Sequence, residues 1–364
     1  MRVRAPGRIC LFGEHQDYLG LPIISAAINR YIYIEGVKID EPFFKIEMPD
    51  INKTRQLSIN ADENLNYENN RDYLLSCLNI LKRKSLDWGS LGYNIKIHGD
   101  IPINAGASSS SAMVIAWILF LSKIGNASFS SSEIAKMGYF AEVKEFNEAG
   151  GMMDHFTSAI GGLMFMETAP EFKHQNIKNY ENNFKDSYIL IDSLQKKDTV
   201  DDLKRTKSES IEAINKINGC YPKFNIRNTQ LKKISPYLDD ISIELRKKIV
   251  GTLMNRDLTI KALHILKMSE SKILSENEKQ SFGSLIYQHH KYLSEYIGIS
   301  TPKIDRLVKL CMENGAKGAK INGSGFGGTL FAYCPKNREN LIEILKSEDV
   351  NIYPVDISMG AGEY

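Results

Sequence analysis

A short loop of small residues between a strand and a helix is the feature that most constrains this chain. Residues 100–112 read DIPINAGASSSSA; Tyr93, Ile95 and Ile97 alternate with polar residues before them, as in a strand with one buried face. Residues 112–121 are uniformly apolar, which predicts a buried helix. The backbone N–H groups of such a loop and the positive end of the following helix favour polyphosphate binding. The alternative is a serine-rich helix cap, because hydroxyls commonly satisfy the first amides of a helix.

The composition predicts an ordinary globular protein in a reducing compartment. A chain of 364 residues exceeds what one hydrophobic core usually serves, so we expect two domains. The formal net charge of +2 gives no electrostatic case for nucleic acid or a membrane surface as a partner. The five cysteines contain no C-x-x-C pair, so neither a disulfide framework nor a zinc site is expected. Charges interrupt the N-terminus and the apolar run is too short to span a bilayer, so we expect a cytoplasmic protein.

Strands dominate the first part of the chain, and helices dominate most of the second. Strands are predicted at residues 9–12, 31–37, 43–48, 55–59, 93–98, 163–166 and 188–192, with a helix at 71–84. Ser130 and Glu133 have capping-box spacing, which predicts a helix from there to about residue 146. Residues 193 to about 312 are mainly helical in pattern, with amphipathic segments at 253–267 and 276–297. We place the domain boundary after the strand at 188–192, which gives domains 1–195 and 196–364.

Two further motifs accompany the loop. GEHQDY at residues 13–18 follows an apolar strand and places Glu14, His15 and Asp17 within four residues; a solvated surface loop is the alternative. KINGSGFGG at 320–328 is a glycine cluster flanked by the apolar runs 319–321 and 329–333, where a tight hairpin is the alternative to a functional loop. Together and in this order, the three motifs indicate more than any one of them alone.

The three motifs resemble those of the GHMP kinase superfamily of small-molecule kinases, and within it those of galactokinase and related sugar 1-kinases. APGRICLFGEHQDY at residues 5–18 is similar to the signature APGRVNLIGEHTDY, the small-residue loop to P-x-x-x-G-L-S-S-S-A, and GSGFGG at 323–328 to GAGFGG. HKYL at residues 290–293 and STPKID at 300–305 are also similar to sequence that the family carries between these motifs. The resemblance implies an α+β fold of two domains, with the active site in the interdomain cleft. It also implies ATP as co-substrate, Mg²⁺ as cofactor, a sugar as acceptor, and packing of the glycine cluster around Gly325 close to the phosphate loop.

The resemblance also implies roles for individual residues. Asp154 matches the proposed base and Arg8 an arginine near the transferred phosphate. The implied sugar-binding residues are Glu14, His15, Asp17 and Gly151, the nucleotide-binding residues are Asn104, Ala105, Gly106, Ala107, Ser108, Ser109 and Ser110, and the metal ligands are Ser110 and Glu142. Ser109 and Ser111 are alternatives to Ser110 as a ligand. Asp154 as an N-cap, Glu142 as a solvated helix residue and Arg8 as an ordinary ion-pair partner are the structural alternatives.

These roles agree with the chemistry of phosphoryl transfer, in which Mg²⁺ and backbone amides hold the phosphates while a carboxylate accepts or orients the acceptor proton. We therefore predict ATP-dependent phosphorylation of a monosaccharide, most simply the C1 hydroxyl of galactose. The alternatives are a mevalonate-kinase-like alcohol kinase and a non-catalytic sugar sensor on the same fold. The sequence indicates no oligomeric state.

Several positions depart from the galactokinase pattern. Cys10 replaces the asparagine of the signature, Leu19 and Leu21 stand in place of a polar turn, and Ala107 replaces leucine. Residues 193–205 contain no tyrosine where galactokinase carries one near the sugar. We therefore expect a different acceptor pocket, with a galactose-like hexose and a pentose such as arabinose both open.

Overall fold

Two β-sheets organise the computed structural model, which describes residues 1–58, 65–67, 69–103, 105–196 and 199–364. The first sheet has the strand order β12-β1-β2-β5-β3-β4, and β6 and β7 join it through β2. Its strands are β1 (Arg2–Phe12), β2 (Ile23–Ile39), β3 (Phe43–Met48), β4 (Lys53–Ser58), β5 (Gly92–Gly99), β6 (Leu163–Glu167), β7 (Lys173–Asn176) and β12 (Gly362–Glu363). The predicted strands at 31–37, 43–48, 93–98 and 163–166 are thus confirmed. The strand predicted at 9–12 is the end of the longer strand β1. The strand predicted at 55–59 is present as β4 up to Ser58, and residue 59 lies outside the described residues.

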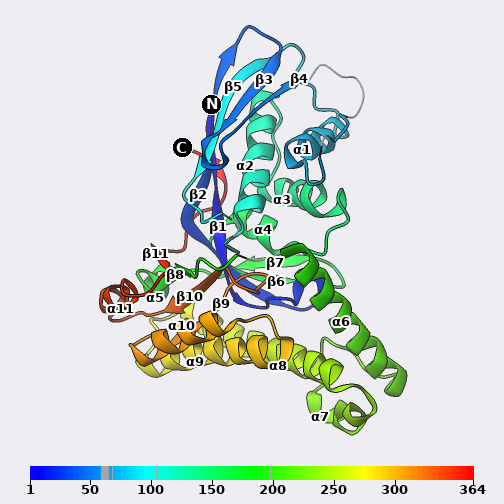
Figure 1. Ribbon diagram of the computed structural model, residues 1–364, viewed down its shortest axis with the longest axis vertical. Helices are drawn as coiled ribbons and strands as arrows, with labels where there is room; N and C mark the ends of the chain where they lie inside the picture. The colour runs from blue at the N-terminus through cyan, green and yellow to red at the C-terminus, as the bar shows by residue number, and fades with distance from the viewer. Residues whose placement is uncertain (59–64, 68, 104, 197–198) are drawn as a thin grey trace.

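Helices α1 (Tyr73–Lys82), α2 (Ser109–Ile124) and α3 (Ser131–Tyr139) lie on one face of the first sheet (Figure 1). The apolar run predicted as a buried helix is the body of α2, where Trp117 stacks on Phe120 with ring centroids 5.6 Å apart. The Trp117 Nε1–H also donates to the carbonyl of Leu74 in α1, at 3.1 Å. Because α2 is packed by both the sheet and its neighbouring helices, its first turn and the loop before it are held in place.

The helix predicted from Ser130 begins as expected and then changes. Ser130 and Glu133 form the reciprocal capping box, and α3 ends at Tyr139. A π-helical turn over Phe140–Lys144 follows, in which Glu145 N–H donates to the carbonyl of Phe140 at 2.9 Å. The predicted helix to about residue 146 is therefore present to Lys144, but its last turn is π-helical rather than α-helical. Single π turns are frequent at functional sites, and this one carries Glu142.

The second sheet has the order β11-β8-β10-β9. Its strands are β8 (Tyr188–Asp192), β9 (Gly318–Ile321), β10 (Thr329–Tyr333) and β11 (Asn351–Val355). The helices beyond α3 are α4 (Met153–Ile160), α5 (Glu181–Phe184), α6 (Thr199–Cys220), α7 (Leu231–Ile234), α8 (Ile243–Ser269), α9 (Glu276–Tyr292), α10 (Pro302–Glu313) and α11 (Arg338–Leu345). Helices α8, α9 and α10 lie together below this sheet in Figure 1. In the described part of the chain, no helix is long and apolar enough to cross a membrane.

Each sheet includes a strand from the other side of the predicted domain boundary. Strand β8, which precedes residue 195, belongs to the second sheet, whereas β12 at the C-terminus pairs with β1 of the first. The N–H of Cys10 in β1 donates to Asn322 Oδ1 at 2.9 Å, which ties β1 to the loop after β9. The boundary after residue 195 stays a prediction. Each sheet contains strands from both sides of it, because β12 belongs to the first sheet and β8 to the second.

Candidate active site

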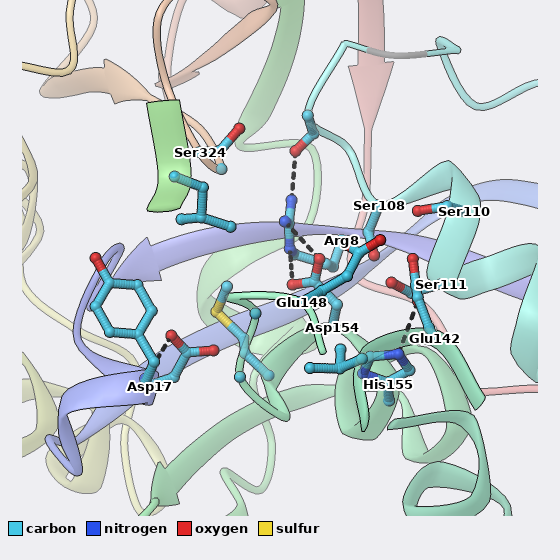
Figure 2. Close-up of a pocket in the computed structure, with 18 of the residues that line it drawn as sticks. Arg8, Asp17, Ser108, Ser110, Ser111, Glu142, Glu148, Asp154, His155 and Ser324 are labelled. Atoms are coloured by element: carbon cyan, nitrogen blue, oxygen red, sulfur yellow. Dashed lines mark hydrogen bonds and ion pairs between the residues drawn. The ribbon is translucent and has the colours of Figure 1, made fainter. Parts of the chain in front are cut away.

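One cleft gathers residues from five segments (Figure 2). They are the loop at residues 13–18, called here the sugar-signature loop, the small-residue loop at 100–112, called the phosphate loop, the π turn, the start of α4 and the β9–β10 loop. Its volume is about 310 Å³, at the lower end of the range typical for small-molecule sites. The described residues that line it are Arg8, Glu14, His15, Asp17, Tyr18, Arg71, Tyr73, Gly106, Ser108, Ser109, Ser110, Ser111, Glu142, Val143, Glu148, Gly150, Gly151, Met153, Asp154, His155, Leu203, Gly323 and Ser324. The structure thus brings Arg8, Asp154, Glu142, the four predicted sugar-binding residues and most of the phosphate loop to one place.

The phosphate loop enters α2 through a left-handed residue. Ser108 is the N-cap with φ of 68°, and its side chain makes no capping hydrogen bond. The serine-cap alternative therefore does not describe Ser108. Gly106 and Ser108–Ser111 line the cleft, whereas Ala105 and Ala107 turn their carbonyls to Thr329 and Arg8, so these two hold the loop rather than face the ligand. Asn104 lies outside the described residues.

The β9–β10 loop is both a hairpin and a wall of the phosphate loop. Strands β9 and β10 pair antiparallel, as the hairpin alternative expected. Asn322 Nδ2 donates to the carbonyl of Gly106 at 3.0 Å, and a Cβ on Gly323 would lie 2.7 Å from that same oxygen. The glycine cluster around Gly325 therefore packs close to the phosphate loop, as expected, and Gly323 is the member that makes the approach. A Cβ on Gly325 would meet Ile299 instead.

Arg8 and Asp154 form the ion pair at the centre of the cleft. Arg8 Nε and Nη2 donate to the two carboxylate oxygens at 2.7 and 2.9 Å, and Nη1 donates to the carbonyl of Gly106. Burial raises the pKa of Asp154, but the charge and hydrogen bonds of Arg8 lower it by more, so it lies below its ordinary value. Asp154 is consequently a carboxylate at neutral pH, and Arg8 links it to the phosphate loop.

Glu142 lies against the first turn of α2, close to Ser110 and Ser111 (Figure 2). His155 Nε2 lies 2.7 Å from Glu142 Oε2, and the carboxylate is buried. Burial raises the pKa of Glu142, but His155 and the two serine hydroxyls lower it by more, which leaves an anion surrounded by donors.

This donor set fits a magnesium ion held in part by its substrate. Carboxylate and hydroxyl oxygens are hard ligands of the kind Mg²⁺ takes together with phosphate oxygens and water. Among the described residues no group of three or more His, Cys, Asp or Glu side chains stands ready to enclose a metal by itself. A site built from Glu142 and a serine therefore depends on the nucleotide for its remaining ligands.

The sugar-signature loop faces the cleft from the opposite side. His15 has φ of 61°, and its two ring nitrogens lie 2.7 Å from Tyr18 Oη and 3.0 Å from the carbonyl of Ser324. Burial and the neighbouring charge of Asp154 raise the pKa of Asp17 to about 6. A Cβ on Gly151 would lie only 2.0 Å from Asp17 Oδ2, so glycine at 151 is required for the carboxylate to sit where it does.

Glu14 is held by two residues, Lys320 and His289, for which the sequence predicted no role. Its Oε1 accepts from the ammonium group of Lys320, a β9 residue with 0% exposure that also donates to the carbonyls of Cys10 and Ile321, at 2.9 Å each. His289 Nε2 accepts from the N–H of Gly13 at 3.1 Å. Burial and the charge of Lys320 hold the pKa of His289 well below its usual range, so the ring is neutral and carries its proton on Nδ1, 3.9 Å from Glu14 Oε2. The sequence does contain a signal for this contact, because a lysine within the apolar run at 318–321 indicates a buried charge that needs a partner.

The four single-residue departures from the galactokinase pattern do not line the cleft. Cys10 is fully buried in β1, Leu21 is buried, and neither Leu19 nor Ala107 belongs to the described lining. The segment that lacks the tyrosine contributes an apolar side chain instead, because Leu203 of α6 faces the cleft. Arg71, Tyr73 and Glu148 also line it and were not anticipated.

Comparison with known families and proteins agrees with this geometry. The GHMP kinases N terminal domain matches residues 72–162, the GHMP kinases C terminal family matches residues 272–351, and the galactokinase galactose-binding signature matches residues 1–37. The chain is 28% identical to galactokinase of Thermosipho africanus over 362 residues, covering 96% of this chain and 93% of that protein. It is 26% identical to galactokinase of Haemophilus influenzae over 346 residues, covering 92% and 85%.

Solved structures show the same fold. Lactococcus lactis galactokinase complexed with galactose superposes with a TM-score of 0.83 at 18% identity, over 100% of this chain and 95% of that one. Methanococcus jannaschii mevalonate kinase superposes with a TM-score of 0.74 at 26% identity, over 98% of each chain. The fold itself is therefore shared by sugar kinases and mevalonate kinases.

The chain belongs to the GHMP kinase superfamily, and its architecture is the α+β fold of that superfamily with N- and C-terminal domains. Within the superfamily it is an ATP-dependent sugar kinase similar to galactokinases, because the signature at its N-terminus and its curated relatives are theirs.

Proposed function

We propose that this protein transfers the γ-phosphate of ATP to the anomeric C1 hydroxyl of galactose or a closely related aldose. The observation that carries the proposal is the Arg8–Asp154 pair, which lies between the phosphate loop and the sugar-signature loop. A nucleotide held by the amides of Gly106 and Ser108–Ser111 and a sugar held by Asp17 would place their reacting groups at this pair.

Each residue of the pair has a distinct role in the proposal. Asp154, an anion because Arg8 depresses its pKa, accepts a hydrogen bond from the acceptor hydroxyl and orients its lone pair toward the phosphorus. A carboxylate of low pKa is a weak base, so orientation contributes more than full proton abstraction before transfer. The guanidinium of Arg8 stabilises negative charge on the transferring phosphoryl group.

A magnesium ion would be held by Glu142 together with Ser110 or Ser111, and it would neutralise charge on the nucleotide phosphates. On the acceptor side, Asp17, His15 and Glu14, whose Oε2 accepts no hydrogen bond from the residues that the structure describes, offer a fixed set of polar groups to sugar hydroxyls.

A coupled ADP-release assay across free aldoses tests the proposal. We expect turnover with galactose or a stereochemically similar aldose, and phosphorus NMR of the product should show an anomeric phosphate. The proposal would be refuted if the protein bound nucleotide but turned over ATP with none of the aldoses. Mevalonate belongs in the same panel, because the mevalonate kinase fold superposes well and the apolar Leu203 lines the cleft.

A further inference from the structure

A second arginine, Arg71, faces the cleft and is held by side chains outside the sequence motifs. Arg71 Nε and Nη2 donate to the carboxylate of Glu148, with the Nη2 to Oε2 distance at 2.8 Å, and the hydroxyl of Tyr73 donates to Glu148 Oε1 at 3.2 Å. Figure 2 shows Glu148 among the lining residues together with Arg8 and Asp154. The guanidinium is therefore presented to the cleft in one orientation.

The backbone that carries Arg71 is itself constrained. Arg71 has φ of 65°, and the next residue, Asp72, is the N-cap of α1. The Asp72 carboxylate accepts two hydrogen bonds from Arg55 at 2.6 and 2.7 Å and has a side-chain exposure of 1%. A left-handed residue other than glycine costs conformational energy that surrounding contacts must offset, and such residues concentrate at functional sites.

The charges of the cleft are unfavourable for a polyphosphate without Arg71. Among the described lining residues, five carry carboxylates and two are arginines, and no lysine belongs to them. Arg8 already gives its donors to Asp154 and to the carbonyl of Gly106. The carboxylates of Glu148 and Glu142 also act electrostatically on Arg71, so Arg71 lies within charge range of the proposed metal ligand.

Arg71 keeps a donor for a ligand. Its side chain is 37% exposed, and Nη1 makes no hydrogen bond to any residue that the structure describes. A guanidinium paired through one edge presents its remaining N–H groups in a fixed plane, which is the geometry that binds phosphate oxygens well. Glu148 and Tyr73 reduce the entropy that Arg71 would otherwise lose on binding.

We propose that Arg71 is a second phosphate-binding cation of this kinase, which contacts the polyphosphate of ATP while Glu148 and Tyr73 hold it in position. The inference rests on the nucleotide half of the proposed function and does not depend on which sugar is the acceptor. It assigns to the segment before α1 a direct part in binding the nucleotide.

Isothermal titration calorimetry tests this proposal. ATP, ADP and adenosine are each titrated into the full chain in the presence of Mg²⁺. In Arg71→Met we expect the dissociation constant for ATP to rise by about tenfold to a hundredfold, the usual effect of losing a hydrogen bond between charged groups, with adenosine binding unchanged. Equal losses for ATP and ADP would place the contact on the α- or β-phosphate, and a loss for ATP alone would place it on the γ-phosphate; both support the proposal. An unchanged affinity for ATP, or an equal loss for adenosine, would overturn it.

Arg83→Met is the matched control. Arg83 also ties α1 to the segment after the π turn, through two hydrogen bonds to Glu145 at 2.7 and 2.8 Å, but it does not line the cleft. This variant should bind ATP as the wild type does. If Arg71→Met fails to fold, Arg71→Lys is the second variant, because it keeps the positive charge but lacks the planar set of guanidinium N–H donors. It should bind ATP several-fold more weakly than the wild type and adenosine equally well.

The outcomes separate the inference from the proposed function. Failure of the wild-type chain to bind any nucleotide would overturn both. Nucleotide binding that depends on Arg71, without phosphorylation of any aldose, would support the inference and refute the acceptor.

Discussion

Replacing Lys320 by Met tests whether the buried ion pair with Glu14 builds the sugar side of the cleft. The ammonium group makes three contacts, to the carboxylate of Glu14 and to the carbonyls of Cys10 and Ile321, and neither charged side chain is more than 1% exposed. Methionine keeps most of the aliphatic stem, so the change mainly removes the charge and its hydrogen bonds.

The expected loss in the free energy of unfolding is about 3–5 kcal/mol, the usual cost of leaving one partner of a buried pair without the other. In the wild type the neighbouring His289 does not share this role, because burial and the charge of Lys320 keep its ring neutral. Changing Glu14 to Gln in the same chain removes the unpaired charge, so the double variant Lys320→Met with Glu14→Gln should recover a large part of the loss.

Chemical denaturation followed by fluorescence of the two buried tryptophans, Trp88 and Trp117, measures the change, and a sugar titration accompanies it. We expect a raised KM for the sugar in both variants with the KM for ATP unchanged, since Glu14 lies on the sugar side. The reasoning is refuted if Lys320→Met costs under about 1 kcal/mol, or if Glu14→Gln restores none of the loss.

Three other predictions concern the reaction itself. Asp154→Ala should lower kcat by at least about a hundredfold with ATP affinity retained, which single-turnover kinetics and nucleotide titration check; an unchanged kcat would contradict the assigned role. Gly151→Ala should raise the KM for the sugar about tenfold and leave the KM for ATP alone, because the added Cβ would displace the Asp17 carboxylate 2.0 Å away; equal changes in both constants would indicate general distortion instead. The pKa of Asp17, raised to about 6, predicts that kcat/KM for the sugar falls as pH drops through 6, and Asp17→Asn should flatten that limb. The same raised pKa means that the folded state binds this proton more tightly, so the contribution of Asp17 to stability is largest below about pH 4 and is lost as pH rises through 6.

The secondary structure near the site could be predicted because its signals are local. The strands at 43–48 and 188–192 agree with the structure residue for residue, and the Ser130 capping box is present. The end of α3 could not be predicted, because the π turn that carries Glu142 still has a helical pattern of burial. Periodicity reports which side of an element is buried, and a change in the hydrogen-bond ladder alters that side very little.

The motif residues were predicted together as a site, but their supports were not. Arg8, Asp154 and Asp17 line one cleft, as the ordered motifs indicated. Arg71 and Glu148 are ordinary charges in the sequence, and only the approach of two loops makes them a pair.

The sequence by itself determined the order of elements, the loop of small residues at Gly106 and the class of chemistry that such a loop serves. Only the tertiary structure decided that Gly323 closes on that loop and that Lys320 holds Glu14, contacts that join residues 217 and 306 positions apart in the chain. Local propensity extends over a few residues, whereas these contacts exist because two sheets pack against each other and a buried charge must find its partner wherever the fold brings one.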